Sequence, residues 1–125
     1  MVKVGDRLSY ERVFTNEEVL QFGEITGDKG RHHVTEDEHG RLVVHGLLTG
    51  SLPTKLAGDF NLLATQISYN FKRQVYTGDK IECVAILTKV DQVKEGRMNI
   101  HGTFECVNQD GTNVLDGDFS GVIFG

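Results

Sequence analysis

The sequence predicts an α+β domain in which an antiparallel sheet wraps around one buried helix. The first half of the chain contains two helix-like segments separated by a polar loop, and the second half alternates strand-like stretches with tight turns. The second helical segment is apolar on nearly all sides, which indicates burial. Because domains commonly hold roughly 100–200 residues, we expect residues 1–125 to form a single domain.

Composition and charge exclude several classes of protein. The formal charge of −5, from 13 basic and 18 acidic residues, argues against a nucleic-acid-binding protein. No apolar run is long enough to cross a membrane, and the first residues, MVKVGDRL, lack the apolar core of a signal peptide. We therefore expect a cytoplasmic protein, in which Cys83 and Cys106 are buried, reduced thiols.

The first helix is predicted from its two ends. Thr15 and Glu18 form a capping box, in which each side chain accepts a hydrogen bond from the backbone of the other. Apolar residues then recur at helical spacing, and Gly27 is a suitable residue to end the helix. We expect a helix over about Asn16–Thr26, preceded by a further strand over Arg7–Phe14.

A polar segment joins this helix to the second one. Residues 27–40, GDKGRHHVTEDEHG, read as a loop, and a short extended stretch follows at residues 42–44. The buried helix is expected from Gly46 to Gly58, although Gly46 and Gly50 lower its helical propensity. Pro53 lies inside this segment and is expected to kink the helix or begin a new turn.

Four strands are expected in the remainder of the chain. Their side chains alternate or are rich in β-branched residues, and the turn residues Thr77–Asp79, Lys94–Gly96 and Asp110-Gly111 separate them. We expect these strands to form an antiparallel meander: Ala64–Phe71, Lys80–Val90, Met98–Val107 and Val114–Phe124. A wrapped sheet keeps free edges, and a free edge commonly pairs with a second copy, so a homodimer or higher homo-oligomer is expected.

The candidate chemistry centres on Asp28 and His33, which lie five residues apart in the polar loop. A carboxylate and an imidazole can hold one water molecule, with one group taking a proton while the other gives one. Gly46 begins the apolar helix, where free backbone N–H groups can stabilise a developing oxyanion. On spacing alone, the pattern slightly favours a solvated polar loop without chemistry.

Three blocks in order carry a resemblance to a known family. The segments GDKGRHH, VVHGLLTGSL and FKRQVYTGD resemble the motifs of the MaoC-like dehydratases, which include the (R)-specific enoyl-CoA hydratases. Asp28, His33, His45 and Gly46 fall on the family's motif positions. Ser51, six residues after His45, matches a family serine that supports the region of the catalytic aspartate.

The resemblance covers almost the whole chain and implies a hot-dog fold, with the sheet around the Gly46–Leu56 helix. The implied reaction is the reversible hydration of a trans-2-enoyl thioester to an (R)-3-hydroxyacyl thioester, with CoA or an acyl-carrier protein as the carrier. Asp28 would deprotonate the attacking water, and His33 would share that water and help deliver a proton. Gly46 N–H would polarise the thioester carbonyl, while His45 would hold the loop and the helix start.

The sequence departs from the family pattern around these residues. Gly30-Arg31 replaces the usual Asn-Pro, and Gln74 replaces a usual proline. The stretch between the two histidine blocks is also shorter than in the hydratases of polyester synthesis. These departures affect the expected acyl-chain length and loop geometry.

The basic residues near these motifs allow two interpretations. Lys29 and Arg31 either contact a phosphate of the ligand or balance Glu36 and Asp37. Lys72 and Arg73 either reach the phosphates of a thioester ligand or are ordinary exposed strand residues.

Two other functions remain possible from the sequence. A hot-dog module that binds acyl thioesters without turning them over is the main alternative, and a thioesterase is the other. A metal is not expected, because the spacing of the histidines and acidic residues matches no common zinc motif. No cofactor is expected, because no dinucleotide fingerprint or phosphate-binding glycine loop is present.

Overall fold

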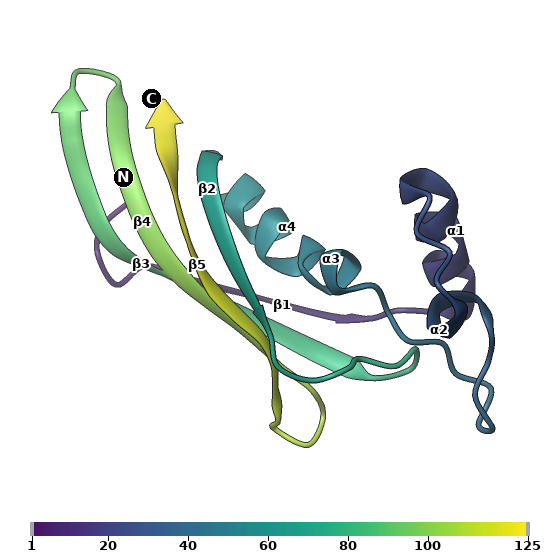
Figure 1. The fold of residues 1–125 in the computed structure, drawn as a ribbon. Coiled ribbons are helices and arrows are strands. Elements are labelled where there is room, and N and C mark those ends of the chain that lie inside the picture. The colour runs from purple at the N-terminus through teal and green to yellow at the C-terminus, as the bar shows by residue number, and fades with distance from the viewer. Residues whose placement is uncertain (1, 125) are drawn as a thin grey trace.

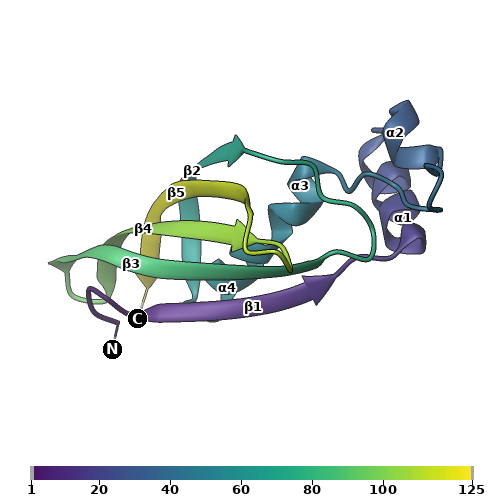
Figure 2. The ribbon, with the colours of Figure 1, turned by 90° about the horizontal axis from the view of Figure 1, so that it is seen from below.

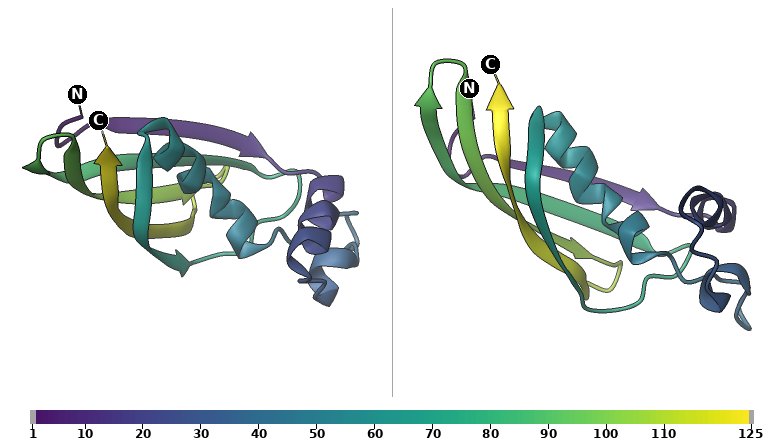
Figure 3. Two further views of the ribbon diagram at one scale, coloured as in Figure 1. Left: turned by 90° about the horizontal axis from the view of Figure 1, so that it is seen from above. Right: turned by 45° about the horizontal axis from the view of Figure 1, so that its top comes forward.

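The computed structural model describes residues 2–124, which form a five-stranded antiparallel sheet and four helices. The sheet is strongly curved and α4 lies on its concave side, while α1 and α2 lie together beyond one end of the sheet (Figures 1 and 3). The elements are, in order, β1 (Arg7–Val13), α1 (Asn16–Thr26), α2 (Arg31–Val34), α3 (Gly46–Thr49), α4 (Ser51–Asp59), β2 (Leu62–Phe71), β3 (Lys80–Lys94), β4 (Arg97–Val107) and β5 (Asn113–Phe124).

The order of the strands in the sheet is β1-β3-β4-β5-β2. The predicted meander is therefore correct for β3, β4 and β5 but wrong for β2, which pairs with β5 at the far edge. The connection over residues 72–79 carries the chain from that edge back towards β1 (Figure 2). The middle of this connection is held against the segment before α3, because Val75 O accepts the N–H of Val44 at 2.7 Å and Tyr76 forms a β-bridge with Val43.

The core lies between the concave face of the sheet and α4. Alternate residues of β3 point inwards and are fully buried, as strand geometry requires, and they meet Leu52 and Leu56 of α4. Cys83 and Cys106 are both fully buried and face each other across β3 and β4, as expected for structural thiols. The hydrogen bond that the Cys106 thiol donates to Cys83, together with burial, raises the pKa of Cys106, which stays protonated.

The expected second helix is divided in two. The break falls at Gly50, between α3 and α4, and not at Pro53, which lies in the first turn of α4 where no backbone N–H is needed. The ring of Tyr69 packs against Gly50, since a Cβ there would lie 2.9 Å from Tyr69 Cε1. The segment is also buried on one face only, because Leu47 is 59% exposed.

The first helix agrees with the prediction at both ends. Thr15 Oγ1 accepts from Glu18 N–H at 3.2 Å, Glu18 Oε1 accepts from Thr15 N–H at 3.0 Å, and Gly27 adopts a left-handed φ of 81°. The strand over residues 7–13 is also confirmed. The polar loop, in contrast, contains the short helix α2, which was not predicted. Within residues 2–124, each helix is too short or too polar to traverse a lipid bilayer.

Candidate active site

A cavity of about 550 Å³ opens where α1, α2 and α3 meet the end of β2. Its walls come from six parts of the chain: the end of α1, the loop and α2, the segment before α3, α3 itself, residues 71–75, and Val114 of β5. Four of the five residues predicted for the site line this cavity, namely Asp28, His33, His45 and Gly46.

Asp28 and His33 face each other in the cavity. The distance from Asp28 Oδ2 to His33 Nε2 is 3.7 Å, which is too long for a direct hydrogen bond. The Asp28 side chain is 58% exposed, whereas that of His33 is only 8% exposed. His33 Nδ1 lies 2.7 Å from Val43 O, and a carbonyl only accepts, so Nδ1 carries a proton. In neutral His33, the lone pair of Nε2 therefore points towards Asp28.

His45 contacts both members of this pair. Its Nε2–H donates to the backbone carbonyl of Asp28 at 2.9 Å, and its ring stacks on that of His33. The edge of the ring also meets Phe22 of α1, with 4.9 Å between the centroids. Through these contacts His45, the residue before α3, is joined to the loop, to α2 and to α1.

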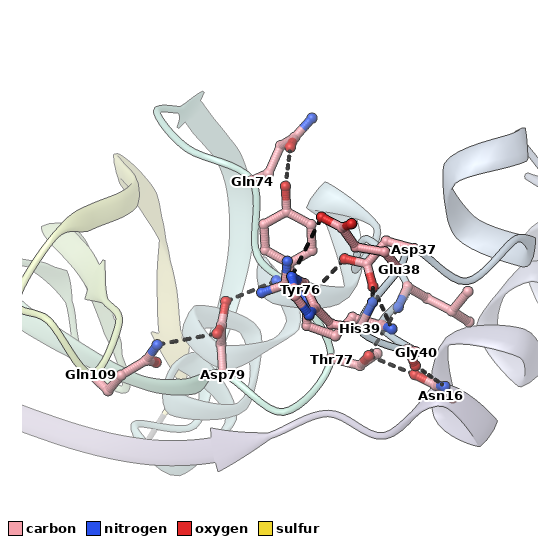
Figure 4. A network of polar contacts seen from close by, with 12 residues as sticks. Asn16, Asp37, Glu38, His39, Gly40, Gln74, Tyr76, Thr77, Asp79 and Gln109 are labelled. Atoms are coloured by element: carbon pink, nitrogen blue, oxygen red, sulfur yellow. Dashed lines mark hydrogen bonds and ion pairs between the residues drawn. The ribbon is translucent and has the colours of Figure 1, made fainter.

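The backbone that positions His33 is held by a polar network (Figure 4). Asn16, the first residue of α1, donates to Gly40 O at 3.0 Å and accepts from Thr77 Oγ1 at 2.5 Å. Thr77 Oγ1 in turn accepts the N–H of Leu42 at 3.0 Å. The network thus fastens the strand-like stretch after the loop to both α1 and the β2–β3 connection. Val43 O, the acceptor for His33 Nδ1, lies within that fastened stretch.

Asp37 and Arg41 close the loop that leads to this stretch. Asp37 accepts the N–H groups of Arg41 and His39 and the Nε of Arg41, each at 2.9 Å. These hydrogen bonds lower the pKa of the Asp37 carboxyl, with the backbone N–H of Arg41 as the largest cause. The Arg41 guanidinium also lies 4.0 Å above the centroid of Tyr76. Lys29 forms an ion pair with Glu24 at 2.7 Å. Its partner is therefore neither Glu36 nor Asp37, the two carboxylates considered from the sequence.

Gly46 has a packing role that the sequence did not indicate. A Cβ at this position would lie 2.6 Å from Cε1 of Phe71, so only glycine allows the ring to approach so closely. Phe71 is nevertheless 58% exposed and lines the cavity. What approaches the Gly46 backbone in this structure is therefore an aromatic side chain of β2.

Ser51, the fifth predicted residue, forms no hydrogen bond with Asp28 among the described residues. Its hydroxyl donates to Leu48 O at 2.5 Å, and Ser51 is not among the residues that line the cavity. Thr49 was not predicted but lines the cavity and is 3% exposed, and its hydroxyl has no hydrogen-bond partner within residues 2–124. Nothing in the sequence around Thr49 had indicated that this residue would line the cavity.

Asp28, His33 and His45 also form a candidate metal-binding group, since one ligand atom of each lies within 4.8 Å of the others. The donor geometry does not favour a metal. The rings of His33 and His45 are nearly parallel, so lone pairs in their planes do not converge on one point. One nitrogen of each ring is also bound to a backbone carbonyl. The arrangement suits a proton-transfer pair better than a metal centre.

A curved antiparallel sheet wrapped around a central helix defines the class of hot-dog proteins. No family model matches the chain. The fold is confirmed by solved structures: an (R)-hydratase from A. caviae matches with a TM-score of 0.86 and 22% identity, over 99% of this chain and 98% of that one. A MaoC-like dehydratase from Rhodospirillum rubrum matches with a TM-score of 0.80 and 16% identity, over 98% and 93%.

Curated relatives point in the same direction. A mitochondrial 3-hydroxyacyl-[acyl-carrier-protein] dehydratase of Solanum lycopersicum is 26% identical over 98% of this chain and 78% of the relative. An enzyme of the same name from Arabidopsis thaliana is 25% identical over the same shares. The named relatives of this chain are thus hydratases and dehydratases.

Proposed function

We propose that the chain is an acyl-thioester hydratase or dehydratase that interconverts a trans-2-enoyl thioester and an (R)-3-hydroxyacyl thioester. The observation that carries this proposal is the separation of 3.7 Å between Asp28 Oδ2 and His33 Nε2 inside the cavity. Both atoms are hydrogen-bond acceptors in the neutral-imidazole state. One water molecule can donate a proton to each of them and keep its oxygen lone pairs free for attack.

In the hydration direction, the oxygen of this water attacks C3 of the enoyl group. A proton passes to the Asp28–His33 pair, the C2–C3 double bond opens, and negative charge moves onto the thioester oxygen. C2 then takes a proton from the pair, so no net proton is gained or lost. The hydrogen bond from His33 Nδ1 to Val43 O fixes the imidazole in the tautomer that this sequence of steps needs.

The developing oxyanion needs hydrogen-bond donors, and the first amides of α3 have no partner within their own helix. We assign this role to the Gly46 N–H. Because the Phe71 ring packs on Gly46, the ring has to leave room for the thioester carbonyl. Its exposed position allows such a movement.

The names of the relatives support the reaction class but not the carrier. The (R)-hydratase from A. caviae and the plant 3-hydroxyacyl-[acyl-carrier-protein] dehydratases together suggest a thioester of CoA or of a carrier protein. A module that binds acyl thioesters without reaction is the alternative. The departure at Gly30-Arg31 from the usual Asn-Pro is the feature of the sequence that motivates this alternative.

The test is the loss of enoyl-thioester absorbance when the purified protein meets crotonyl-CoA, with Asp28→Asn as the matched variant. We expect turnover in the parent and a reduction of about 10²–10⁴-fold in the variant, the usual contribution of an acid–base group. Equal rates in both proteins would refute the assignment of Asp28. Binding of crotonyl-CoA without turnover in the parent would favour the binding module.

We also propose that two copies pair through β2. This strand lies at the edge of the sheet, and most of its residues are exposed, among them Leu63 at 62% and Phe71 at 58%. An unpaired apolar edge is a template for a second strand. The single-domain organisation of residues 1–125 and the cytoplasmic location both stay predictions.

A further inference from the structure

Two consecutive basic residues, Lys72 and Arg73, lie at the rim of the candidate active-site cavity. Both line the cavity, and both are exposed to solvent, which places their side chains at its mouth. They directly follow Phe71, the last residue of β2 and the residue that packs on Gly46. The rim is therefore connected to the place where the thioester carbonyl is proposed to lie.

The backbone of this dipeptide is firmly held. The N–H groups of Lys72 and Arg73 both donate to Val114 O, at 2.9 and 3.3 Å. Val114 belongs to β5, is buried, and also lines the cavity. The two side chains thus start from a fixed point on the sheet, even though their ends reach solvent.

The positive charges of Lys72 and Arg73 are not neutralised by an ion pair among the described residues. Among residues 2–124, neither Lys72 nor Arg73 forms an ion pair, whereas Lys29, Lys55 and Lys80 pair with carboxylates at 2.7, 2.6 and 3.0 Å. Lys72 has only a small effect on Asp116, as the last of several causes that lower the pKa of that carboxyl. Asp28 is the only carboxylate among the described residues that line the cavity. A locally positive rim thus stands on a chain with a net charge of −5.

We propose that Lys72 and Arg73 bind the phosphate of a 4′-phosphopantetheine arm. This inference rests on the proposed function, because it requires a thioester substrate. CoA and acyl-carrier proteins both present their acyl groups on this arm, whose sulfur end is neutral and whose far end carries the phosphate. With the thioester beside Asp28 and His33, the slender arm leaves through the mouth, and a Lys–Arg pair there suits a phosphate.

The experiment compares thioesters with and without the phosphate. The double variant Lys72→Ala/Arg73→Ala should raise KM for crotonyl-CoA by about 10–100-fold, because removing a charge-assisted hydrogen bond weakens binding by a factor of that order. The crotonyl thioester of N-acetylcysteamine lacks the phosphate, so its KM should be unchanged. Lys89→Ala/Lys94→Ala is the matched control, because it removes the same charge on β3, away from the cavity.

Further substrates distinguish the phosphate of the pantetheine arm from the nucleotide phosphates of CoA. Crotonyl-4′-phosphopantetheine and a crotonyl-carrier protein should show the same KM increase as crotonyl-CoA. A change limited to crotonyl-CoA would mean that the nucleotide phosphates are bound instead, and it would overturn the proposal. An equal change for the N-acetylcysteamine thioester would also overturn it, since the residues would then act as part of the cavity wall.

Calorimetry can measure the binding of 4′-phosphopantetheine to the parent, the rim variant and the control, even if no thioester is turned over. If the parent hydrates none of the thioesters, the proposed function fails. Binding that is weakened in the rim variant and not in the control would still support the phosphate site. Equal binding by all three proteins would refute it.

Discussion

The imidazole ring of His45 lies almost flat against that of His33, with 3.8 Å between the centroids and 14° between the planes. The same ring donates a hydrogen bond to the carbonyl of Asp28. One side chain thereby sets the position of both proposed acid–base groups. His45 is best described as a positioning residue, because it touches these groups rather than a reacting atom.

Replacing His45 tests this role. His45→Phe keeps a flat ring against His33 but removes the hydrogen bond to Asp28, whereas His45→Ala removes both. We expect kcat to fall by about 5-fold in the first variant, because a hydrogen bond with a net value of about 1 kcal/mol is removed, and further in the second. KM should change little in His45→Phe. Steady-state kinetics with crotonyl-CoA measures both constants, and unaltered kcat in both variants would contradict the positioning role.

A side chain at position 46 should displace Phe71. Gly46→Ala places a Cβ 2.6 Å from the ring, and because Phe71 is exposed, the ring can move without unfolding the chain. Because the nearest atoms that a Cβ at position 46 would meet all belong to the Phe71 ring, chemical denaturation should show little loss of stability. KM should rise, and adding Phe71→Ala should partly restore it. A KM equal to that of the parent would show that the ring does not govern access to the cavity.

Acid should weaken the capping box of α1. The hydrogen bond from the backbone of Thr15 and the contact with Arg12 hold the pKa of Glu18 below 4.5. A lowered folded-state pKa gives stability that is present above the unfolded value and is lost as the pH falls through the folded value. Below pH 4.5, Glu18→Gln should therefore lose less stability than the parent. Urea denaturation across that range measures this difference, and parallel curves would exclude a contribution from Glu18.

The edge of β2 should control assembly. Leu63→Asp puts a charge on the exposed edge of each copy, so two edges brought together would repel each other. We expect the parent to sediment as a dimer and the variant as a monomer that keeps its secondary structure. His101→Asp on β4 adds the same charge as a control, because His101 is exposed, lies inside the sheet order and faces Lys89 on β3. A monomeric parent would rule out the proposed pairing.

Local patterns were enough to predict much of this fold. The ends of α1 depend on Thr15, Glu18 and Gly27, all within the helix or beside it, so the sequence alone located them. The place of β2 in the sheet depends instead on partners far along the chain. Likewise, the helix broke at Gly50 because Tyr69 packs there, an approach that no neighbouring residue reveals.

The site was predictable to a similar extent. The motif positions placed four of the five predicted residues around one cavity. The exception, Ser51, is bound to Leu48 O one turn earlier. Thr49 and Phe71 could not be predicted as cavity residues, because their exposure to the cavity follows from the break in the helix and from the position of β2.

The walls of the cavity have a consequence for how such a protein can change. All the groups proposed to move protons or steady the oxyanion lie on one continuous stretch, residues 28–46, whereas residues 71–75 and Val114 supply the opposite wall. Reactivity and substrate choice are thus encoded in separate parts of the gene. Evolution, or a protein engineer, can reshape this wall to change how a substrate is held while the residues proposed to carry the reaction stay the same.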